Sequence, residues 1–372
     1  MKIGIVGAGI MGLASAWALA RRGHAVTVFD QGPIPNPVCS SFDEHRIIRH
    51  AYGNMRGYAL MMPEAFAAWG RMWDDLGRSH FVPAPATYCF RMEFDWYRHV
   101  SACLDHMGIA YRDVPPDEVA RDLPMVNRDG LFRVVETHGS GLLMADRIVT
   151  DLVRALPAMG VDLRPHSRIA AVDPERARLD GWEGDAIVVA AGAWVGQLLG
   201  ELPEAPRPTA QTVVYLEPPA DLAEAWSRAP LLLNRLPVAS GGAYILPPLA
   251  GSRLKAGDYA HNDDGAPDAP RVPTARQIER VMEAARLSLA GFERYRMIEA
   301  KSCLYTVTSD ERFAIRPLGA RGWLASACSG HGFKMAALVG EAVADGVTGA
   351  RPAAEVTDWM AARLTDPILA EV

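Results

Sequence analysis

The chain has little cysteine, and its few thiols are scattered. Five cysteines stand far apart in 372 residues, with no Cys-x-x-Cys pair among them: Cys39, Cys89, Cys103, Cys303 and Cys328. Disulfide frameworks and structural zinc sites need paired or closely spaced cysteines. The sequence therefore predicts free thiols, and we expect no metal site.

An excess of positive charge is also missing. Lysine and arginine number 38 against 44 acidic residues, so the formal net charge is −6, and the isoelectric point is near 5.9. A nucleic-acid surface or a polybasic membrane patch needs clustered positive charge. We expect neither a nucleic-acid partner nor a membrane partner, so any positive charge used in function must be local.

The N-terminal segment is the place to look for a membrane span or a leader. Residues 3–20 carry no charge, but four of them are glycines, which suits neither a span nor the apolar core of a leader. The segment continues through residues 21–24 into a strand-like run. We expect it to be part of a mature, folded protein that is cytoplasmic and monomeric.

The first 30 residues alternate between strand and helix patterns. Residues 2–6 and 25–29 are short apolar runs typical of buried strands, and residues 10–22 between them are typical of a helix. This order is a βαβ unit, in which a crossover helix joins two parallel strands. Residues 31–45 are polar and rich in proline, which predicts a loop.

The rest of the chain continues this alternation without repeats or low-complexity tracts. Hydrophobic residues make up 49% and charged residues 22%, an ordinary globular balance. The patterns predict helices over 58–77, 147–158, 275–290 and 333–345. They predict strands over 87–92, 131–136, 186–192, 211–217, 243–258 and 323–327, and a mobile surface loop over 262–273.

A glycine-rich turn joins the first strand to the first helix. Gly7, Gly9 and Gly12 form the pattern G-x-G-x-x-G. The first permits a tight turn, the second lets a pyrophosphate approach the backbone, and the third lets helix and strand pack closely. Asp30 ends the second strand, where its carboxylate can accept ribose hydroxyls. The motif predicts an adenine dinucleotide but does not decide between FAD and NAD.

Three further segments carry a resemblance to a known family. They are Ser40-Ser41 followed by R-I-I-R-H-A-Y-G at 46–53, then C-L-Y-T at 303–306, and S-G-H-G-F-K at 329–334. Their order and spacing resemble the monomeric sarcosine oxidase and N-methyltryptophan oxidase group, within the D-amino-acid-oxidase-like flavoproteins. The resemblance covers almost the whole chain, including the run that ends at Gly192, and implies FAD as the cofactor.

The first of these segments holds two arginines, Arg46 and Arg49, among apolar neighbours. From the residues alone, they could be guanidinium groups that bind a carboxylate or an ordinary solvated basic turn. The resemblance implies that Arg49 binds the substrate carboxylate and that Arg46 lies against the flavin ring. It also implies that Lys334 is a second carboxylate-binding cation, although a lysine is more often on the surface.

Four matched positions would hold the cofactor: Ser41, Gly330, Gly332 and Phe333. The two glycines follow a predicted strand, so the backbone can approach a planar ring there. The next helix would direct its N-terminus, with its partial positive charge, toward the flavin.

Cys303 lies in a strand-like run, where a free thiol usually belongs to the core. The resemblance implies instead that it carries FAD through a thioether at the flavin 8α position. Tyr305, two residues on, would point to the same face of the strand and match an active-site tyrosine. Cys328 adjoins the S-G-H-G turn, and we expect it to be structural.

Lys255 stands at a family position that orients a water over the flavin and promotes reaction with O2. A cation there would act electrostatically, without proton transfer. Tyr244, eleven residues earlier, matches a substrate-side tyrosine.

Two positions depart from the family pattern. The family has a histidine four residues after the lysine, where this chain has Tyr259, with His261 two residues further on. The family's histidine after the paired serines is replaced by Phe42, while His45 precedes Arg46. These departures leave the substrate and any general acid or base open.

The expected fold is α/β. A doubly wound FAD-binding Rossmann-type domain (residues 1–82, 143–208 and 310–372) would be interleaved with an antiparallel-sheet substrate domain (residues 83–142 and 209–309). The expected function is an FAD-dependent amine oxidase. It would convert a small secondary amino acid, either sarcosine-like or a cyclic imino acid such as proline or pipecolate, to an imine while O2 is reduced to H2O2.

Three alternatives stay open. The first is an FAD-dependent amino-acid dehydrogenase that passes electrons to an acceptor other than O2. The second is a non-catalytic flavin-bearing subunit. The third is an NAD-dependent dehydrogenase, which only the features of residues 1–30 support.

The colour of the purified protein separates flavin from nicotinamide. We expect a yellow protein that absorbs in the blue, because the flavin ring does so. With a thioether at Cys303, the colour stays with acid-precipitated wild-type protein, and Cys303→Ser releases all of it; absorbance of pellet and supernatant measures both. Complete release from the wild type would contradict the linkage, as would covalent flavin in Cys303→Ser.

Overall fold

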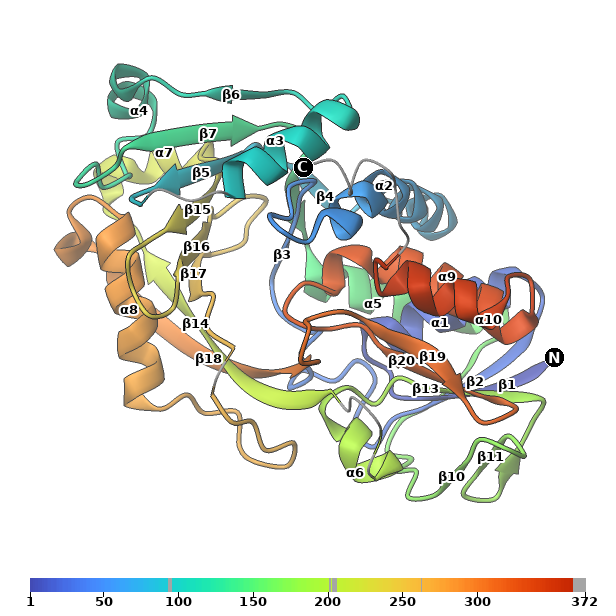
Figure 1. Cartoon of the computed structure of the whole chain (residues 1–372). Helices are drawn as coiled ribbons and strands as arrows, with labels where there is room; N and C mark the ends of the chain where they lie inside the picture. Colours follow the sequence, from blue (N-terminus) through green and yellow to red (C-terminus); the bar gives the residue numbers. More distant parts are fainter. Residues whose placement is uncertain (93–95, 201, 203–205, 262, 364–372) are drawn as a thin grey trace.

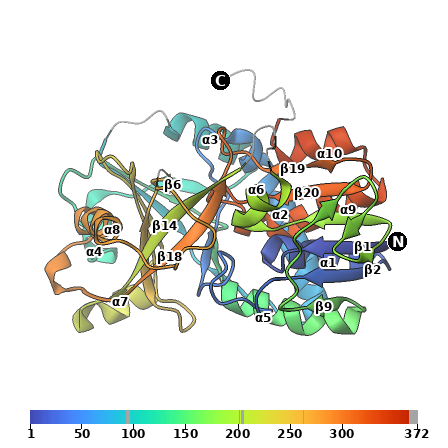
Figure 2. The same cartoon turned by 90° about the horizontal axis from the view of Figure 1, so that it is seen from below.

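Two lobes, each built on a large sheet, lie side by side in the computed structural model of the chain (Figures 1 and 2). The structure describes residues 1–92, 96–200, 202, 206–261 and 263–363. The helices are α1 (Ile10–Arg21), α2 (Arg56–Leu76), α3 (Trp96–His106), α4 (Pro116–Asp122), α5 (Ala145–Ala155), α6 (Val195–Leu199), α7 (Ala223–Ser227), α8 (Ala275–Ser288), α9 (Ala336–Thr348) and α10 (Ala353–Met360). No helix of these described ranges is long and apolar enough to span a membrane.

The first lobe contains a six-stranded sheet. Its strands, in spatial order, are β19 (Ala314–Leu318), β20 (Gly322–Ser326), β13 (Ala186–Val189), β1 (Lys2–Val6), β2 (Ala25–Phe29) and β9 (Asp162–Arg164). Neighbours from β20 to β9 are parallel, and β19 is antiparallel to β20. The inner strands β1, β2 and β13 are short apolar runs, as expected where both faces of a parallel sheet are covered. The predicted βαβ unit is confirmed as β1, α1 and β2.

Different layers cover the two faces of this sheet. Helices α1, α2, α5 and α9 share one hydrophobic core with one face. The other face is covered by α6 and by a small sheet of β10 (Val172–Asp173), β11 (Arg178–Leu179) and β12 (Trp182–Glu183). A Cβ on Gly4 of β1 would lie 2.6 Å from the Trp182 ring. The glycine therefore lets this tryptophan pack flat on the sheet.

The second lobe contains an eight-stranded sheet. Its strands, in spatial order, are β18 (Arg296–Val307), β14 (Arg207–Glu217), β17 (Leu254–Asp258), β16 (Gly242–Leu246), β15 (Leu231–Arg235), β5 (Ala86–Phe90), β7 (Arg133–Thr137) and β6 (Tyr111–Asp113). All neighbours are antiparallel except β15 and β5. Helix α8 packs on this sheet through its apolar side. The predicted α/β class, with its second antiparallel sheet, is confirmed.

The two lobes are joined by chain segments that are far apart in sequence. Strand β18 extends from the large sheet to the 3-10 turn Gly192–Trp194, which follows β13 (Figure 2). A further three-stranded sheet of β3 (Arg46–Ile48), β8 (Gly141–Leu143) and β4 (Phe81–Pro83) lies between them. The residue boundaries of the two expected domains stay a prediction.

Several expected element ends are wrong by a few residues, for local reasons. Helix α5 ends at Ala155 rather than at 158, and a 3-10 turn follows because Pro157 has no N–H to donate. The expected helix from 333 begins as a 3-10 turn, so α9 starts at Ala336. Strand β13 ends at Val189, three residues before Gly192. Residue 262 of the expected surface loop lies outside the described residues.

Helices α1 and α9 approach each other closely at Gly340. A Cβ on Gly340 would lie 2.4 Å from the carbonyl oxygen of Ala14, so backbone would have to move. We expect Gly340→Ala to lower the free energy of unfolding by about 1–3 kcal/mol, as overpacked cores do. The matched control is Gly70→Ala in α2, where nothing lies within 4 Å and helix propensity gives a gain of roughly 0.5–1 kcal/mol. Denaturant unfolding measures both, and equal effects would contradict the close contact.

Candidate active site

The glycine-rich turn lies at the carboxyl ends of β1 and β13. The strand order runs from β1 to β2 on one side and to β13 on the other, and open α/β sheets bind ligands at such a point. Gly7 has a φ of +105°, and a Cβ there would lie 2.4 Å from the carbonyl oxygen of Ala190. A Cβ on Gly12 would lie 1.9 Å from the oxygen of Gly7. The turn can therefore form only with glycine at both positions.

Two side chains hold this turn in place. The Asp30 carboxylate accepts hydrogen bonds from the backbone N–H groups of Ala8 and Gly32, both at 2.8 Å. The hydroxyl oxygen of Ser41 accepts from the N–H of Ile10, the first residue of α1, at 2.9 Å. Each carboxylate oxygen keeps a further lone pair for a ligand hydroxyl.

A cavity of about 290 Å³ opens over the turn. Ten expected site residues line it: Gly7, Gly9, Asp30, Ser41, Arg46, Gly192, Tyr305, Gly330, Gly332 and Phe333. Gly12 lies behind the turn, where it serves packing rather than the ligand. Cys39 and Cys328 also line this cavity. The structural role that we expect for Cys328 stays a prediction.

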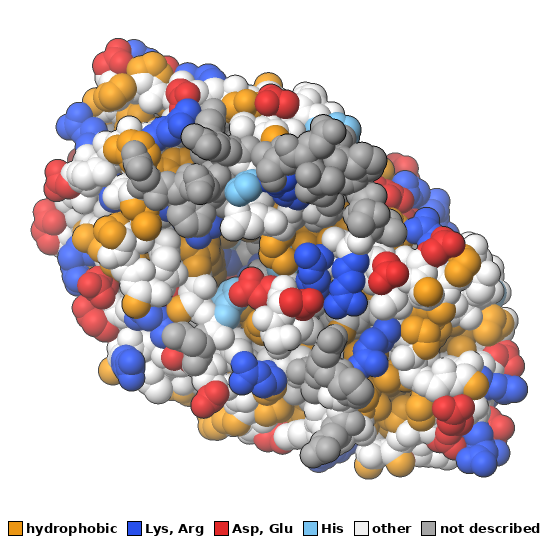
Figure 3. Space-filling model, in the orientation of Figure 1, with side chains coloured by type: hydrophobic (Ala, Val, Ile, Leu, Met, Phe, Trp, Pro, Cys, Tyr) orange, Lys and Arg blue, Asp and Glu red, His pale blue; other side chains and the backbone are white. Residues whose placement is uncertain are grey.

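A second cavity of about 560 Å³ lies between the two large sheets and shares five lining residues with the first: Cys39, Arg46, Tyr305, Gly330 and Phe333. The space-filling view shows a hollow where the lobes meet (Figure 3). The remaining expected residues line this second cavity: Arg49, Tyr244, Lys255, Cys303 and Lys334. The structure therefore gathers all of the expected site residues except Gly12 around two adjoining cavities.

Two cations on the cavity wall have no acidic partner. Arg49 and Lys334 are at most partly exposed, and no acidic residue of the described chain forms an ion pair with either. Atoms Nε and Nη1 of Arg49 are buried without a hydrogen-bond partner. Both cations face the ring of Tyr52, at 5.5 Å and 5.0 Å from its centroid. Burial and the charge of Arg49 hold the pKa of Lys334 well below its usual value.

A third cation, Lys255, is paired within the chain. Its side chain is 2% exposed, and Nζ lies 2.9 Å from Oδ2 of Asp43 and donates a second hydrogen bond to the carbonyl of His45. Burial lowers the pKa of Lys255 to about 8, although the charge of Asp43 acts in the opposite direction. Asp43 is also bound by Arg46 and by the hydroxyl of Tyr215.

Arg46 is therefore engaged by groups of its own chain. Its guanidinium binds Asp43 and donates to the carbonyl oxygens of His45 and Ser40, at 3.0 Å and 2.9 Å. Neither Arg46 nor Arg49 lies on a solvated turn, because both line the cavity, which excludes that alternative. Arg46 lines both cavities, whereas Arg49 lines the second alone.

Residues 303–305 of β18 and the facing strands complete the wall. Cys303 and Tyr305 both line the second cavity, as expected for alternate positions of a strand. Burial raises the pKa of the Cys303 thiol to about 11, with the charge of Arg46 opposing it. A Cβ on Gly257 would lie 2.3 Å from the Tyr244 hydroxyl, so this glycine makes room for the tyrosine ring.

The two departures from the family pattern both reach the second cavity. Phe42 and Tyr259 line it, and the guanidinium of Arg235 lies 4.7 Å from the centroid of the Tyr259 ring. His261 lines it as well, 3.5 Å from the carboxylate of Glu311.

His45 is different, because its side chain is buried and lines neither cavity. Burial and the charge of Lys255 hold its pKa well below the usual value. Only its backbone carbonyl contributes to the site.

Sequence reasoning missed three residues of this site. Asp43 lies three positions before Arg46, a spacing that can bring acid and base together, but a loop carboxylate is usually solvated. Tyr52 belongs to the R-I-I-R-H-A-Y-G string, so that string could have indicated it. Tyr215 lies in an ordinary strand pattern, and nothing in the sequence relates it to Asp43.

The fold and the paired cavities define a class: an α/β protein with a dinucleotide-binding turn on its parallel sheet and a second cavity beside that site. The chain belongs to the FAD dependent oxidoreductase family, whose model matches residues 2–346. It is therefore an FAD-dependent oxidoreductase.

Named relatives are distant but cover most of the chain. Peroxisomal sarcosine oxidase of Mus musculus is 25% identical over 91% of this chain and 89% of its own. N-methyl-L-tryptophan oxidase of Yersinia pestis (strain Pestoides F) is 24% identical over 91% and 93%. The solved structure of L-proline dehydrogenase from P. horikoshii has a TM-score of 0.81 at 19% identity and covers 97% of both chains, which is a likeness of fold.

The residues present fit FAD. Asp30 stands where the adenosine ribose would lie, and the turn at Gly7–Gly12 offers backbone N–H groups and a helix N-terminus to a pyrophosphate. Gly330 leaves backbone rather than side chain at the wall shared by the cavities, and Gly332 does so at the wall of the first cavity. Arg46 and Tyr305 border both cavities and would hold the flavin end.

A substitution at Gly9 can test this fit of FAD without disturbing the fold. A Cβ there would meet only the Ser41 hydroxyl, at 3.3 Å, and would point into the first cavity. In a Cys303→Ser background, we expect Gly9→Val to raise the dissociation constant of FAD by at least about tenfold, equivalent to 1.4 kcal/mol. Flavin fluorescence titration measures this. Gly196→Val, at an open position of α6, is the control, and an unchanged FAD affinity in Gly9→Val would contradict the placement.

Proposed function

We propose that the chain oxidises a small secondary amino acid at the carbon beside its nitrogen, and that Arg49 and Lys334 bind the substrate carboxylate. The observation that carries this proposal is a pair of cations, the buried Lys334 and the half-buried Arg49, that face one cavity without an acidic partner in the described residues. Burial and the nearby charge of Arg49 destabilise the charged form of Lys334. A bound carboxylate would compensate both cations at once.

The electrostatics of Lys334 support an anionic ligand. Its low pKa arises from burial and from the neighbouring arginine, so an arriving carboxylate would favour the protonated form. Charge-assisted hydrogen bonds to a carboxylate are stronger than neutral ones. Tyr52 lies under both cations, and its ring face attracts positive charge, so it would keep both oriented toward the cavity.

FAD, when bound, would supply the redox chemistry: it accepts a hydride equivalent from the substrate carbon and passes two electrons to O2, which yields H2O2. The substrate amine must be neutral for this, and its imine product hydrolyses in water. The chain contributes binding and orientation through Arg49 and Lys334. Tyr244 and Tyr305 stand on neighbouring walls of the same cavity, where they would limit the position of the amine.

We assign promotion of the reaction with O2 to Lys255. Its ammonium is buried on the wall of the second cavity, and a fixed cation there stabilises negative charge that develops on O2. Two relatives named as oxidases support this assignment. If the reduced protein reacts with a dye but not with O2, the chain is instead a dehydrogenase.

We also propose that Cys303 carries FAD covalently. The thiol lines the second cavity beside Arg46 and Tyr305, which border both cavities. Cys39 and Cys328 also line the first cavity, so serine variants of these two are the matched controls for Cys303→Ser. We further propose that the protein is a cytoplasmic monomer and that it has the two interleaved domains expected from the sequence.

The substrate carboxylate can be tested with paired substrates. For an oxidised amino acid such as sarcosine, proline or pipecolate, we expect Arg49→Ala to lower kcat/KM on the order of 10- to 100-fold, mainly through KM. A lost charge-assisted hydrogen bond is worth about 1.5–3 kcal/mol. The control is the same amine without its carboxylate, for which wild type and Arg49→Ala should have similar kcat/KM. Equal losses for both substrates would contradict carboxylate binding by Arg49.

A further inference from the structure

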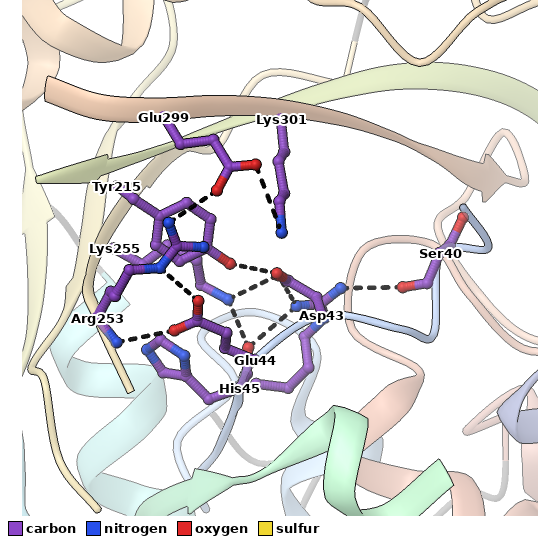
Figure 4. Close-up of polar contacts among 10 residues, drawn as sticks. Ser40, Asp43, Glu44, His45, Tyr215, Arg253, Lys255, Glu299 and Lys301 are labelled. Atoms are coloured by element: carbon purple, nitrogen blue, oxygen red, sulfur yellow. Dashed lines mark hydrogen bonds and ion pairs between the residues drawn. The ribbon is translucent and has the colours of Figure 1, made fainter. Parts of the chain in front are cut away.

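The carboxylate of Asp43 is the centre of a buried polar cluster (Figure 4). Lys255 of β17 lies 2.9 Å from it, and Arg46 of β3 and the hydroxyl of Tyr215 of β14 also donate to it. The side chain of Asp43 is 9% exposed, and that of Lys255 is 2% exposed. Three elements that are far apart in sequence therefore meet on one carboxylate.

The balance of charge in this cluster is positive. Two cations, Arg46 and Lys255, share one carboxylate, so one net positive charge remains at the cavity wall. Burial tends to raise the pKa of Asp43, but the charges of Lys255 and Arg46 outweigh it and hold that pKa well below its usual value. Asp43 is thus ionised throughout the physiological range, as a counter-ion must be.

Lys255 depends on that counter-ion. An ammonium taken out of water loses its proton easily, since burial disfavours the charged form. The other groups near Lys255 do little to stabilise its charged form. Arg46 repels it, Cys303 is a protonated thiol at neutral pH, and His45 contributes a neutral carbonyl. Asp43 is the one group of the described cluster that carries a negative charge and binds Nζ.

A second layer keeps Asp43 in place. Arg253 lies 3.9 Å above the ring of Tyr215 and forms ion pairs with Glu44 and Glu299. Lys301 pairs with Glu299 at 3.7 Å and also lies over the Tyr215 ring. The cations Arg253 and Lys301, and not Glu299 itself, contact the ring of the tyrosine whose hydroxyl binds Asp43 (Figure 4). The outer carboxylates bind Arg253 and Lys301 rather than Lys255.

We propose that Asp43 is a positioning residue for Lys255: its carboxylate holds the ammonium at the wall of the second cavity and keeps it protonated at neutral pH. This proposal rests on the proposed function, in which Lys255 promotes the reaction with O2. Asp43 acts through charge and geometry, and no proton moves between the two groups. An uncharged side chain at position 43 would lower the pKa of Lys255, so a smaller fraction of the ammonium would stay protonated at neutral pH.

The scarcity of lysine makes this directly measurable. The sequence has four lysines, Lys2, Lys255, Lys301 and Lys334, so protein labelled with ¹³C at the lysine ε carbon gives four signals, and Lys255→Met identifies one of them. In the wild type we expect that signal to titrate with a midpoint near 8. In Asp43→Asn we expect the midpoint to fall by about one to three pH units, the shift that a close opposite charge produces.

Two controls belong to this titration. Glu299→Gln makes the same carboxylate-to-amide change in the outer layer, without contact to Lys255, and should leave the midpoint unchanged. Lys334, which faces Arg49 rather than Asp43, is the internal control in every sample. An unshifted Lys255 midpoint in folded Asp43→Asn overturns the proposal.

The reaction with O2 provides the second measurement. When the anaerobically reduced holoenzyme is mixed with O2, we expect the rate constant in Asp43→Asn at pH 7 to be about 2- to 100-fold below that of the wild type, in step with the fall of the Lys255 midpoint, and to recover toward acid pH, where Lys255 regains its proton. Glu299→Gln should follow the wild-type pH profile.

A double variant keeps the test decisive if Asp43→Asn folds poorly. Asp43→Asn combined with Lys255→Met removes both partners and leaves no buried lysine without its counter-ion. Its reaction with O2 should match that of Lys255→Met alone; a further tenfold loss would show that Asp43 does not act through Lys255 and would overturn the proposal. If Lys255→Met itself reacts normally with O2, the proposed role of Lys255 fails, while the lysine titration still decides the effect of Asp43.

Discussion

The cavity where the two large sheets meet is lined by several buried or half-buried cations, among them Arg46, Arg49, Lys255 and Lys334. A buried charge needs an opposite charge or hydrogen bonds close by. Arg46 and Lys255 share the carboxylate of Asp43. Arg49 and Lys334 have no acidic partner in the described chain and face the cavity instead. One side of the cavity is therefore compensated by the protein itself, and the other side is compensated only when an anion arrives.

The two parts of the site, for the dinucleotide and for the substrate, are built from different chemical groups. The dinucleotide-binding part of the site is formed by backbone, since a side chain at Gly7 or Gly12 would clash with neighbouring backbone atoms. The substrate end depends on side chains that strands of the large sheet carry to the wall, such as Tyr244 and Lys255. Strand β18 joins the two ends because it extends from the large sheet to the first lobe. A flavin that spans both cavities would thus meet a rigid backbone on one side and charged groups on the other.

The predictable parts of this protein were those that depend on neighbouring residues. The strand, glycine turn and helix at the N-terminus follow from local sterics and from the period of apolar residues, and Asp30 follows from its place at a strand end. Arg49 and Lys334 were indicated by resemblance, and the structure brings both to one cavity. Element ends were less predictable, as the early end of α5 before Pro157 shows.

The sequence by itself determined the dinucleotide turn, because a motif of six residues contains all the steric requirements of that turn. It also determined that charge used in function must be local, since the whole chain is acidic. Only the tertiary structure decided which cation is free and which is paired. Asp43 and Lys255 are 212 positions apart and Asp43 and Tyr215 are 172 apart. Their contacts exist because long-range strand pairing buries them together, and the free energy of a buried charge depends on such neighbours rather than on sequence.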